Sequence, residues 1–286
     1  MTVDIPINNG ALFKSESILL CGGGGSTKSG IKNKAILMDL EGAVKDEIIL
    51  EKEHDSIMSI HSVDDFIVFC ANDSKSNLKE KINNDIRVYK YSKKFELQWV
   101  GQAVFNPPAE YVRVVKISPN KEYILCGTTE KTIIATKLHQ YSPLKGELPD
   151  EVYDIDFIDD TIAIITMPSQ IAIIDIKPDR IENLFILPLP SYSGNKAAPI
   201  YRCSRLVQHK DKLKLLIVTN IGRSQGYLSW FDVQKEETIR EVKDESNKEN
   251  ARRKSIATTN WKFKFIKTKC VSRESIRNIA TSYFYY

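Results

Sequence analysis

Short apolar runs that each end in a small residue recur along this chain. Three or four apolar residues precede glycine, alanine or threonine, and successive copies are spaced by about 40 to 56 residues. Such a period is typical of propeller blades, which repeat about every 40–45 residues before longer loops are added. The copies are Ile18–Gly22, Ile67–Ala71, Ile124–Gly127, Ile164–Thr166 and Leu216–Thr219.

A second apolar segment follows each copy and predicts its partner strand. These segments are rich in Ile and Val, and several alternate apolar with polar residues, which indicates strands with one buried face. Clusters of Asp, Asn, Pro and Ser, as in Ser118–Lys121 and Asp159-Asp160, come before the apolar runs and predict tight turns. The partner strands are Asn33–Leu40, Asn84–Tyr91, Lys131–Leu138, Ser169–Ile176 and Gly226–Val233.

Each repeat therefore predicts three strands and a more variable outer strand, such as Phe95–Val104. No segment carries a sustained helical stripe, and the small residues fit crowded strands near a propeller axis. The Trp-Asp pair of WD repeats is missing, with Met38-Asp39 and Phe231-Asp232 as weak echoes. We predict an all-β, WD-like β-propeller with five recognisable blades. The alternative is a β-sandwich, which the regular period argues against.

Two polar segments interrupt this pattern. Asn72–Asn84 is expected to be a mobile surface insertion. Lys235–Ser255 is highly charged and has few large apolar residues, so we expect a disordered loop. Within it, Arg252–Ser255 resembles the target of a basophilic kinase, although such a run also suits a simple solvated loop.

The last residues predict more strand. Trp261–Lys269 alternates apolar and basic residues as an outer strand would, and Arg277–Tyr286 resembles the start of a sixth blade. A propeller ring needs its last blade to close on its first, because open sheet edges are liabilities. We therefore expect one propeller domain over residues 1–286 that is either imperfectly closed or a shortened version of a longer protein.

Composition narrows the class of protein. The formal net charge of +4 is spread along the chain and does not by itself indicate nucleic acid. The five cysteines have no zinc-ligand spacing, so we expect reduced, buried thiols. The sequence shows neither a secretory signal nor an apolar stretch of membrane-spanning length, which predicts a soluble chain.

The most unusual segment, Gly22–Asn33, joins the first two predicted strands of blade 1. It nearly matches a phosphate-binding P-loop, but Thr27 replaces the second glycine and a strand follows where a P-loop would open a helix. A dinucleotide-binding fingerprint fails for the same reason. Two interpretations stay open: a flexible hairpin loop, or a folded recognition loop whose glycine carbonyls gather around a cation. In the second, Lys28, Lys32 and Asn33 would project from a rigid platform.

Gly22–Gly25 followed by Gly30-Ile31-Lys32-Asn33-Lys34, in the first blade of a divergent propeller, resembles a known family. This is the guanine-nucleotide exchange factor of the endoplasmic reticulum that starts COPII vesicle formation, whose animal relatives are called prolactin regulatory element-binding protein. The motif covers about a dozen residues. Elsewhere the resemblance is one of blade layout.

The resemblance implies a seven-bladed cytosolic propeller, usually tethered to the endoplasmic reticulum by a C-terminal helix, that activates the small GTPase of the COPII coat. It implies Asn33 as the residue critical for exchange, and potassium held by backbone carbonyls of Gly23, Gly24 and Gly25. The GTPase-binding loop would comprise Gly22, Gly23, Gly24, Gly25, Lys28, Gly30, Ile31, Lys32 and Asn33.

No covalent chemistry is expected of such a protein, because exchange requires only tighter binding of the nucleotide-free GTPase. The histidines, His54, His61, His139 and His209, form no evident catalytic set. The sequence departs from the family in having no membrane anchor and about two blades fewer. The alternatives are therefore a non-catalytic propeller scaffold and an inactive, truncated paralogue of the secretory pathway.

Overall fold

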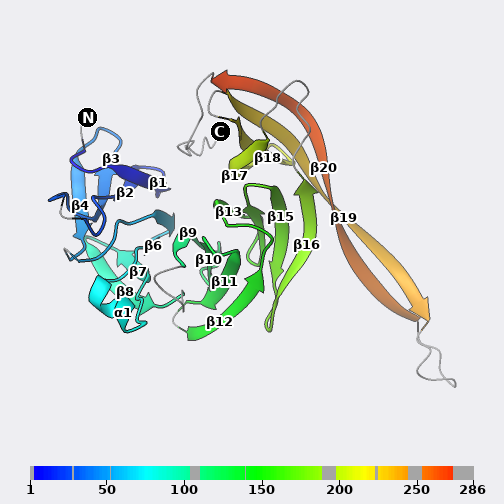
Figure 1. Cartoon of the computed structure of the whole chain (residues 1–286). Helices are drawn as coiled ribbons and strands as arrows, with labels where there is room; N and C mark the ends of the chain where they lie inside the picture. Colours follow the sequence, from blue (N-terminus) through cyan, green and yellow to red (C-terminus); the bar gives the residue numbers. More distant parts are fainter. Residues whose placement is uncertain are drawn as a thin grey trace.

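The computed structural model describes residues 3–27, 29–51, 53–103, 110–138, 140–188, 198–222, 225–243 and 253–272. Within these ranges the chain forms five antiparallel sheets of four strands, here called blades 1 to 5. In every blade the strands are consecutive in sequence and adjacent in space. Figure 1 shows the blades following one another along an arc, with blades 1 and 5 at its ends.

The strands have these bounds. Blade 1 contains β1 (Ile7–Phe13), β2 (Ser17–Gly22), β3 (Lys34–Asp39) and β4 (Val44–Ile49). Blade 2 contains β5 (Ser59–Val63), β6 (Phe66–Cys70), β7 (Ile86–Tyr91) and β8 (Phe95–Gly101). Blade 3 contains β9 (Val112–Ile117), β10 (Tyr123–Thr128), β11 (Thr132–Lys137) and β12 (Gln140–Glu147). Blade 4 contains β13 (Asp154–Phe157), β14 (Ile162–Thr166), β15 (Gln170–Ile176) and β16 (Ile181–Pro188). Blade 5 contains β17 (Pro199–His209), β18 (Lys212–Ile221), β19 (Gln225–Lys243) and β20 (Arg253–Ser272).

The predicted strands are confirmed, but the apolar runs are not the strands nearest the axis. The five apolar runs form the second strand of each blade, and their predicted partners form the third. The strands nearest the axis are instead β1, β5, β9, β13 and β17, which contact one another in series from blade to blade. At Gly127 the reason for a small residue differs from the one expected: a Cβ there would lie 2.3 Å from Val152 Cγ1, in the segment leading to the next blade.

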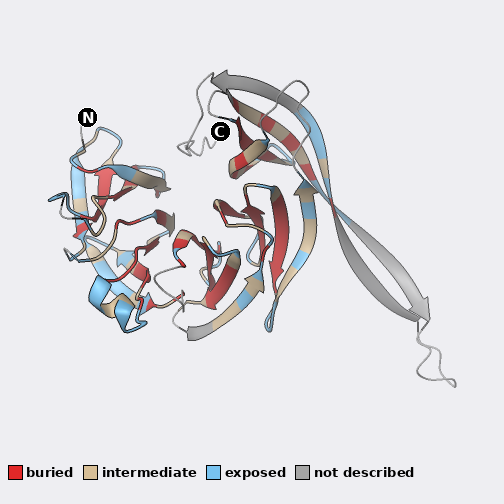
Figure 2. Cartoon of the chain, in the orientation of Figure 1, coloured by how far each residue is buried: buried red, intermediate tan, exposed pale blue. Residues whose placement is uncertain are grey.

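The hydrophobic core lies between the blades rather than within them. Four clusters of buried residues occupy the four junctions between consecutive blades, and Figure 2 shows the buried positions concentrated on the inner and middle strands. Leu125 and Ile165, for example, are fully buried in the cluster between blades 3 and 4. Each blade therefore depends on its neighbour for burial of its faces.

Side chains of one inner strand satisfy backbone N–H groups of the next inner strand. The Val115 N–H donates to Ser59 Oγ at 3.2 Å, and the Ile117 N–H donates to His61 Nδ1 at 3.2 Å. Between blades 4 and 5 the same spacing of two residues recurs, because Asp154 and Asp156 accept from the N–H groups of Ser204 and Leu206 at 3.1 and 2.8 Å. Side chains thus provide acceptors for an inner edge that has no further strand beside it.

Lys116 differs from these paired side chains, because it is buried near the axis and forms no ion pair with any residue in the described ranges. Burial, helped by the charge of Arg205 and partly offset by Asp156 and Asp154, lowers the pKa of Lys116 from 10.5 to about 8. At pH 7 the ammonium form still predominates, but the folded chain binds this proton more weakly than the unfolded chain does.

We expect Lys116→Met to raise the free energy of unfolding at pH 7 by about 2–3 kcal/mol. The unfolded chain keeps this proton up to pH 10.5, whereas the folded chain releases it near pH 8. The wild-type chain consequently gains stability relative to the variant as the pH rises through this window. Urea unfolding at pH 7, 9 and 10.5 measures the difference. A gap that stays constant with pH would contradict the assignment, and Lys94→Met, at an exposed position, is the control.

The charged segment of blade 5 corrects an expectation. Lys235–Ser255 was predicted to be disordered, but residues 235–243 continue β19 and residues 253–255 begin β20. The two strands pair in register to Lys243↔Arg253, so each residue finds a backbone partner that composition alone cannot reveal. The predicted outer strand Trp261–Lys269 lies within β20. Residues 244–252, and the proposed sixth blade at 277–286, lie outside the described residues.

The described part of the chain contains one helix, α1 (Lys75–Lys79). No described helix has both the length and the apolar character needed to cross a membrane.

Candidate functional site

The glycine segment joins β2 to β3 and folds back on itself through side chains at its base. Gly23 has a φ of +145°, and a Cβ there would lie 2.2 Å from Asn33 Oδ1. Gly25 has a φ of +70°, a conformation that glycine adopts at little cost. A strand, β3, follows the loop, as predicted when the P-loop was set aside. The glycines therefore serve close packing and backbone shape.

Asn33 holds the loop closed. Its Nδ2 donates to the carbonyl oxygens of Gly25 at 3.1 Å and His54 at 2.8 Å, while its Oδ1 accepts from the Gly25 N–H at 2.9 Å. The residue is only 4% exposed. The expectation that Asn33 projects from the platform is therefore wrong, because all these hydrogen bonds draw its side chain inward.

The outer part of the loop carries the exposed positions. Ile31 is 40% exposed, and Gly30 and Lys32 are exposed beside it. Gly22 is buried at the end of β2, and Gly24 is half-buried. Lys28 lies outside the described residues. Of the predicted set, the positions that the structure makes available to a partner are thus Gly30, Ile31 and Lys32.

Two further apolar side chains lie at the same corner and were missed from sequence. Ile7 is 50% exposed at the end of β1, opposite Gly22 in the β1–β2 ladder, and Met58 is 43% exposed. Asn8 links them to the loop base, because its Nδ2 donates to Ser56 Oγ at 2.7 Å and lies 3.7 Å from Met58 Sδ. Ile7 begins β1 and Met58 precedes β5, so both lie outside the apolar runs from which the strands were predicted.

Asp55 and His54 connect the loop to blade 2. Asp55 Oδ1 accepts from the Ser26 N–H at 3.3 Å and the Ser56 N–H at 2.8 Å. His54 Nε2 lies 3.1 Å from Asp73 Oδ1 in the segment that follows β6. The glycine loop is therefore braced by polar groups from a second blade.

The insertion Asn72–Asn84 also differs from its prediction as a mobile surface loop. Asp73 is 3% exposed and Asn83 is fully buried. Burial favours a raised pKa for Asp73, but hydrogen bonds from the Ser74 N–H, Asn77 and Asn84 outweigh it and the pKa is lowered. Ser74 caps α1 by accepting from the Asn77 N–H. The density of Asn, Asp and Ser, taken as a sign of mobility, instead builds a buried hydrogen-bond network.

The described residues offer no acid–base or nucleophilic set at this site. His61 lies in β5, where burial lowers its pKa well below the usual value, and His209 ends β17. His139 lies outside the described residues. Burial raises the pKa of the Cys21, Cys70 and Cys126 thiols, which disfavours the reactive thiolate. These three cysteines are buried free thiols, as predicted, and Cys203 is half-buried.

The carbonyls implied as potassium ligands already accept hydrogen bonds. The Gly24 oxygen accepts from Thr27 Oγ1 at 2.7 Å, the Gly25 oxygen from Asn33 Nδ2 at 3.1 Å, and the Gly23 oxygen from Ser56 Oγ at 3.5 Å. A carbonyl oxygen has two lone pairs, so a cation would have to share each oxygen with its donor. These hydrogen bonds hold the loop in shape whether or not a cation is bound.

Comparison with known proteins bears on the fold. No family model matches the chain. The crystal structure of Hsv2 from Kluyveromyces marxianus superposes with a TM-score of 0.52 over 94% of this chain and 73% of that one, at 12% sequence identity. The chain has a β-propeller fold. At this identity the similarity establishes the arrangement of blades, as the sequence predicted, and says nothing of activity.

Proposed function

We propose that this propeller is a guanine-nucleotide exchange factor for the small GTPase of the COPII coat, acting through the glycine loop of blade 1. The observation that carries the proposal is the Asn33 clamp, which fixes Gly25 and His54 in one arrangement. A loop without a role has no need for such internal order. The ordered loop supports the choice of a recognition loop over a flexible hairpin.

The proposed exchange mechanism depends on how the loop fits the GTPase and involves no bond cleavage. A loop that fits the nucleotide-free GTPase better than the nucleotide-bound form weakens nucleotide binding by the same factor. Pre-ordering matters because a loop that is already fixed loses little conformational entropy on binding. Ile31 and Lys32 would contact the GTPase, with Ile7 and Met58 extending the apolar contact. Asn33 is then a positioning residue that acts through the backbone of Gly25.

The resemblance places such a protein at the cytosolic face of the endoplasmic reticulum. Membrane attachment and potassium are part of the same proposal, and no step of the mechanism is routed through the ion. Measuring exchange in potassium and in sodium salts of equal ionic strength separates a specific ion requirement from general screening.

We expect the wild-type chain to accelerate release of a fluorescent GDP analogue from the COPII GTPase. Asn33→Ala should reduce that acceleration by at least tenfold, because three hydrogen bonds that shape the loop are lost. Ile31→Ala should also reduce it while leaving the melting temperature unchanged, since Ile31 is an exposed side chain. Gln98→Ala, on the exposed outer strand of blade 2, is the matched control.

A wild-type chain that leaves the release rate unchanged would remove the exchange proposal for this chain. Capture of the GTPase without any effect on nucleotide release would instead favour the scaffold alternative. Capture that requires the nucleotide-free form agrees with exchange.

A further inference from the structure

Three inner strands carry a β-bulge near their first residues. In β1, β9 and β17 the register against the second strand of the blade shifts by one residue, and the extra residues are Asn8, Arg113 and Arg202. A bulge leaves its extra residue unpaired in the ladder and re-aims its side chain. Blades 3 and 5 therefore both present an arginine at this position.

All three bulges lie on the face of the propeller that carries the glycine loop, termed here the glycine-loop face. Ile7, at the start of β1, pairs with Gly22, where the loop begins. Neighbouring inner strands run in the same direction, because the hydrogen bonds between them advance together along both strands. The starts of β9 and β17 therefore lie on the same face as the start of β1.

Both arginines contact one aromatic ring. The guanidinium carbon of Arg113 lies 4.0 Å from the ring centroid of Tyr153, and that of Arg202 lies 5.6 Å from it. Tyr153 directly precedes β13, so blades 3, 4 and 5 meet at this ring. Stacking on an aromatic face orients the guanidinium plane, and its N–H groups can then bind a planar partner in a fixed geometry.

The two arginines differ in their counter-charge. Arg113 Nη1 lies 2.5 Å from Glu151 Oε2. The Arg202 side chain forms no hydrogen bond or ion pair with a residue of the described ranges, and its Nε is buried without a partner. A buried donor without a partner costs free energy that an acceptor would recover. Arg202 is thus a cation whose donors suit a carboxylate, as Glu151 shows for Arg113.

We propose that Arg202, placed by its bulge and by Tyr153, binds a carboxylate from an acidic segment of a partner protein that docks on the glycine-loop face. A carboxylate fits better than a phosphate dianion, because Glu151 already neutralises Arg113 and one guanidinium of the pair is left. A formal net charge of +4 makes a second copy of this chain repulsive at long range and attracts an acidic partner.

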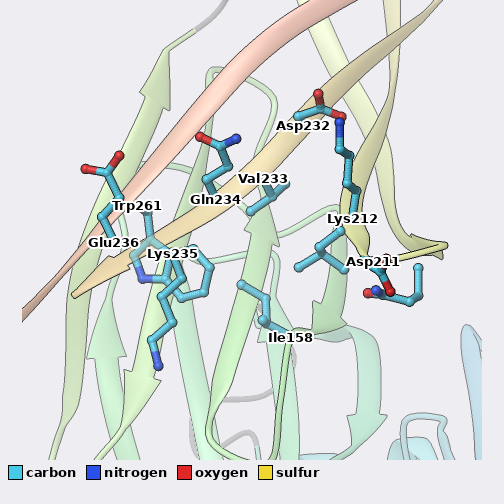
Figure 3. A pocket seen from close by; sticks show the side chains of 11 residues that line it. Ile158, Asp211, Lys212, Asp232, Val233, Gln234, Lys235, Glu236 and Trp261 are labelled. Atoms are coloured by element: carbon cyan, nitrogen blue, oxygen red, sulfur yellow. The ribbon is translucent and has the colours of Figure 1, made fainter.

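The pocket on the opposite face has the wrong charge for the same ligand. Its volume is about 530 Å³, and it lies between blades 4 and 5, at the other end of β17 from Arg202. Figure 3 shows acidic and basic side chains around it, and the charged lining residues are Asp211, Lys212, Asp232, Lys235 and Glu236. Because carboxylates outnumber ammonium groups in this lining, the pocket disfavours a further carboxylate.

The probe is hexaglutamate, capped at both ends and titrated into the full chain while NMR follows the arginine Nε–H signals. We expect the Arg202 signal, assigned by its loss in Arg202→Lys, to shift with hexaglutamate and not with capped hexaglutamine. Arg202→Gln should weaken hexaglutamate binding by about tenfold, because the charged fork is lost. It should leave the melting temperature within about 2 °C of the wild type, because this side chain has no hydrogen bond to lose.

Arg180→Gln is the matched control. Arg180 is an exposed arginine in the turn between β15 and β16, and it already pairs with Asp179 and Glu182. Its replacement should leave the affinity for hexaglutamate unchanged.

Three results would overturn the proposal. The first is an Arg202 signal that hexaglutamate does not shift. The second is a larger effect of inorganic phosphate than of hexaglutamate at equal ionic strength, which would assign the site to a phosphate-bearing ligand. The third is self-association of the chain that Arg202→Gln abolishes, which would assign the site to a second copy. These measurements contain no GTPase, so their outcome is independent of nucleotide exchange.

Discussion

Replacing Asp154 by alanine lowers the free energy of unfolding by about 3–5 kcal/mol, the expected cost of breaking a buried ion pair by removing one partner. Asp154 is 5% exposed at the start of β13. Its carboxylate pairs with the guanidinium of Arg205 and accepts from the Ser204 N–H at 3.1 Å. The alanine variant thus leaves a charge and a backbone donor without this acceptor at the junction of blades 4 and 5.

Urea unfolding measures this loss, with two comparison variants. Asp154→Asn keeps an oxygen that can accept from the Ser204 N–H. It should therefore lower the free energy of unfolding by less than Asp154→Ala does. Asp160→Ala, at an exposed turn position of the same blade, should change stability by less than about 0.5 kcal/mol. Equal effects of the substitutions at Asp154 and Asp160 would show that the junction does not depend on this carboxylate.

Gly23→Ala is expected to disrupt the glycine loop, at a cost of about 3 kcal/mol or more. The new Cβ would lie 2.2 Å from Asn33 Oδ1 and 2.6 Å from Asn33 Cα, so backbone as well as side chain must move. The Asn33 clamp on Gly25 would open, and amide exchange at Gly25 should accelerate. Thermal unfolding and amide exchange together measure the two effects.

Gly30→Ala is the matched control. Gly30 also has a positive φ, +78°, but a Cβ there meets nothing within 4 Å. The substitution should therefore cost only the backbone strain, about 1–2 kcal/mol, and leave the Gly25 amide protected. If both alanine variants opened the loop equally, close packing around Gly23 would not be what shapes it.

The second and third strands of each blade were readable from sequence because they carry the core. Ile124–Gly127 and Lys131–Leu138, for example, are bounded by turn residues and contribute apolar side chains to the junctions on both faces. The inner strands were harder to place. β5 contains Ser59, His61 and Ser62, and two of these polar side chains accept from blade 3. Their pattern reflects hydrogen bonds to a neighbouring blade, which one blade's sequence does not reveal.

The site was predicted only in outline for a related reason. Four consecutive glycines mark the loop, but the inward position of Asn33 depends on the His54 carbonyl, 21 residues away along the chain. Asp73 likewise gains its contact with His54 only when blade 2 folds against the end of blade 1. Contacts of this kind depend on tertiary structure, whereas strands and turns depend on local sequence.

The consecutive order of strands within each blade has a consequence for how the protein is made. Within the described chain, every blade is built from four consecutive strands. Each sheet can therefore form its hydrogen bonds soon after its residues leave the ribosome. The acceptors on an inner strand, such as Asp154 and Asp156, are then already in place when the amides of the following blade arrive. During synthesis from the N-terminus, each completed blade thus presents hydrogen-bond acceptors to the blade that is made after it.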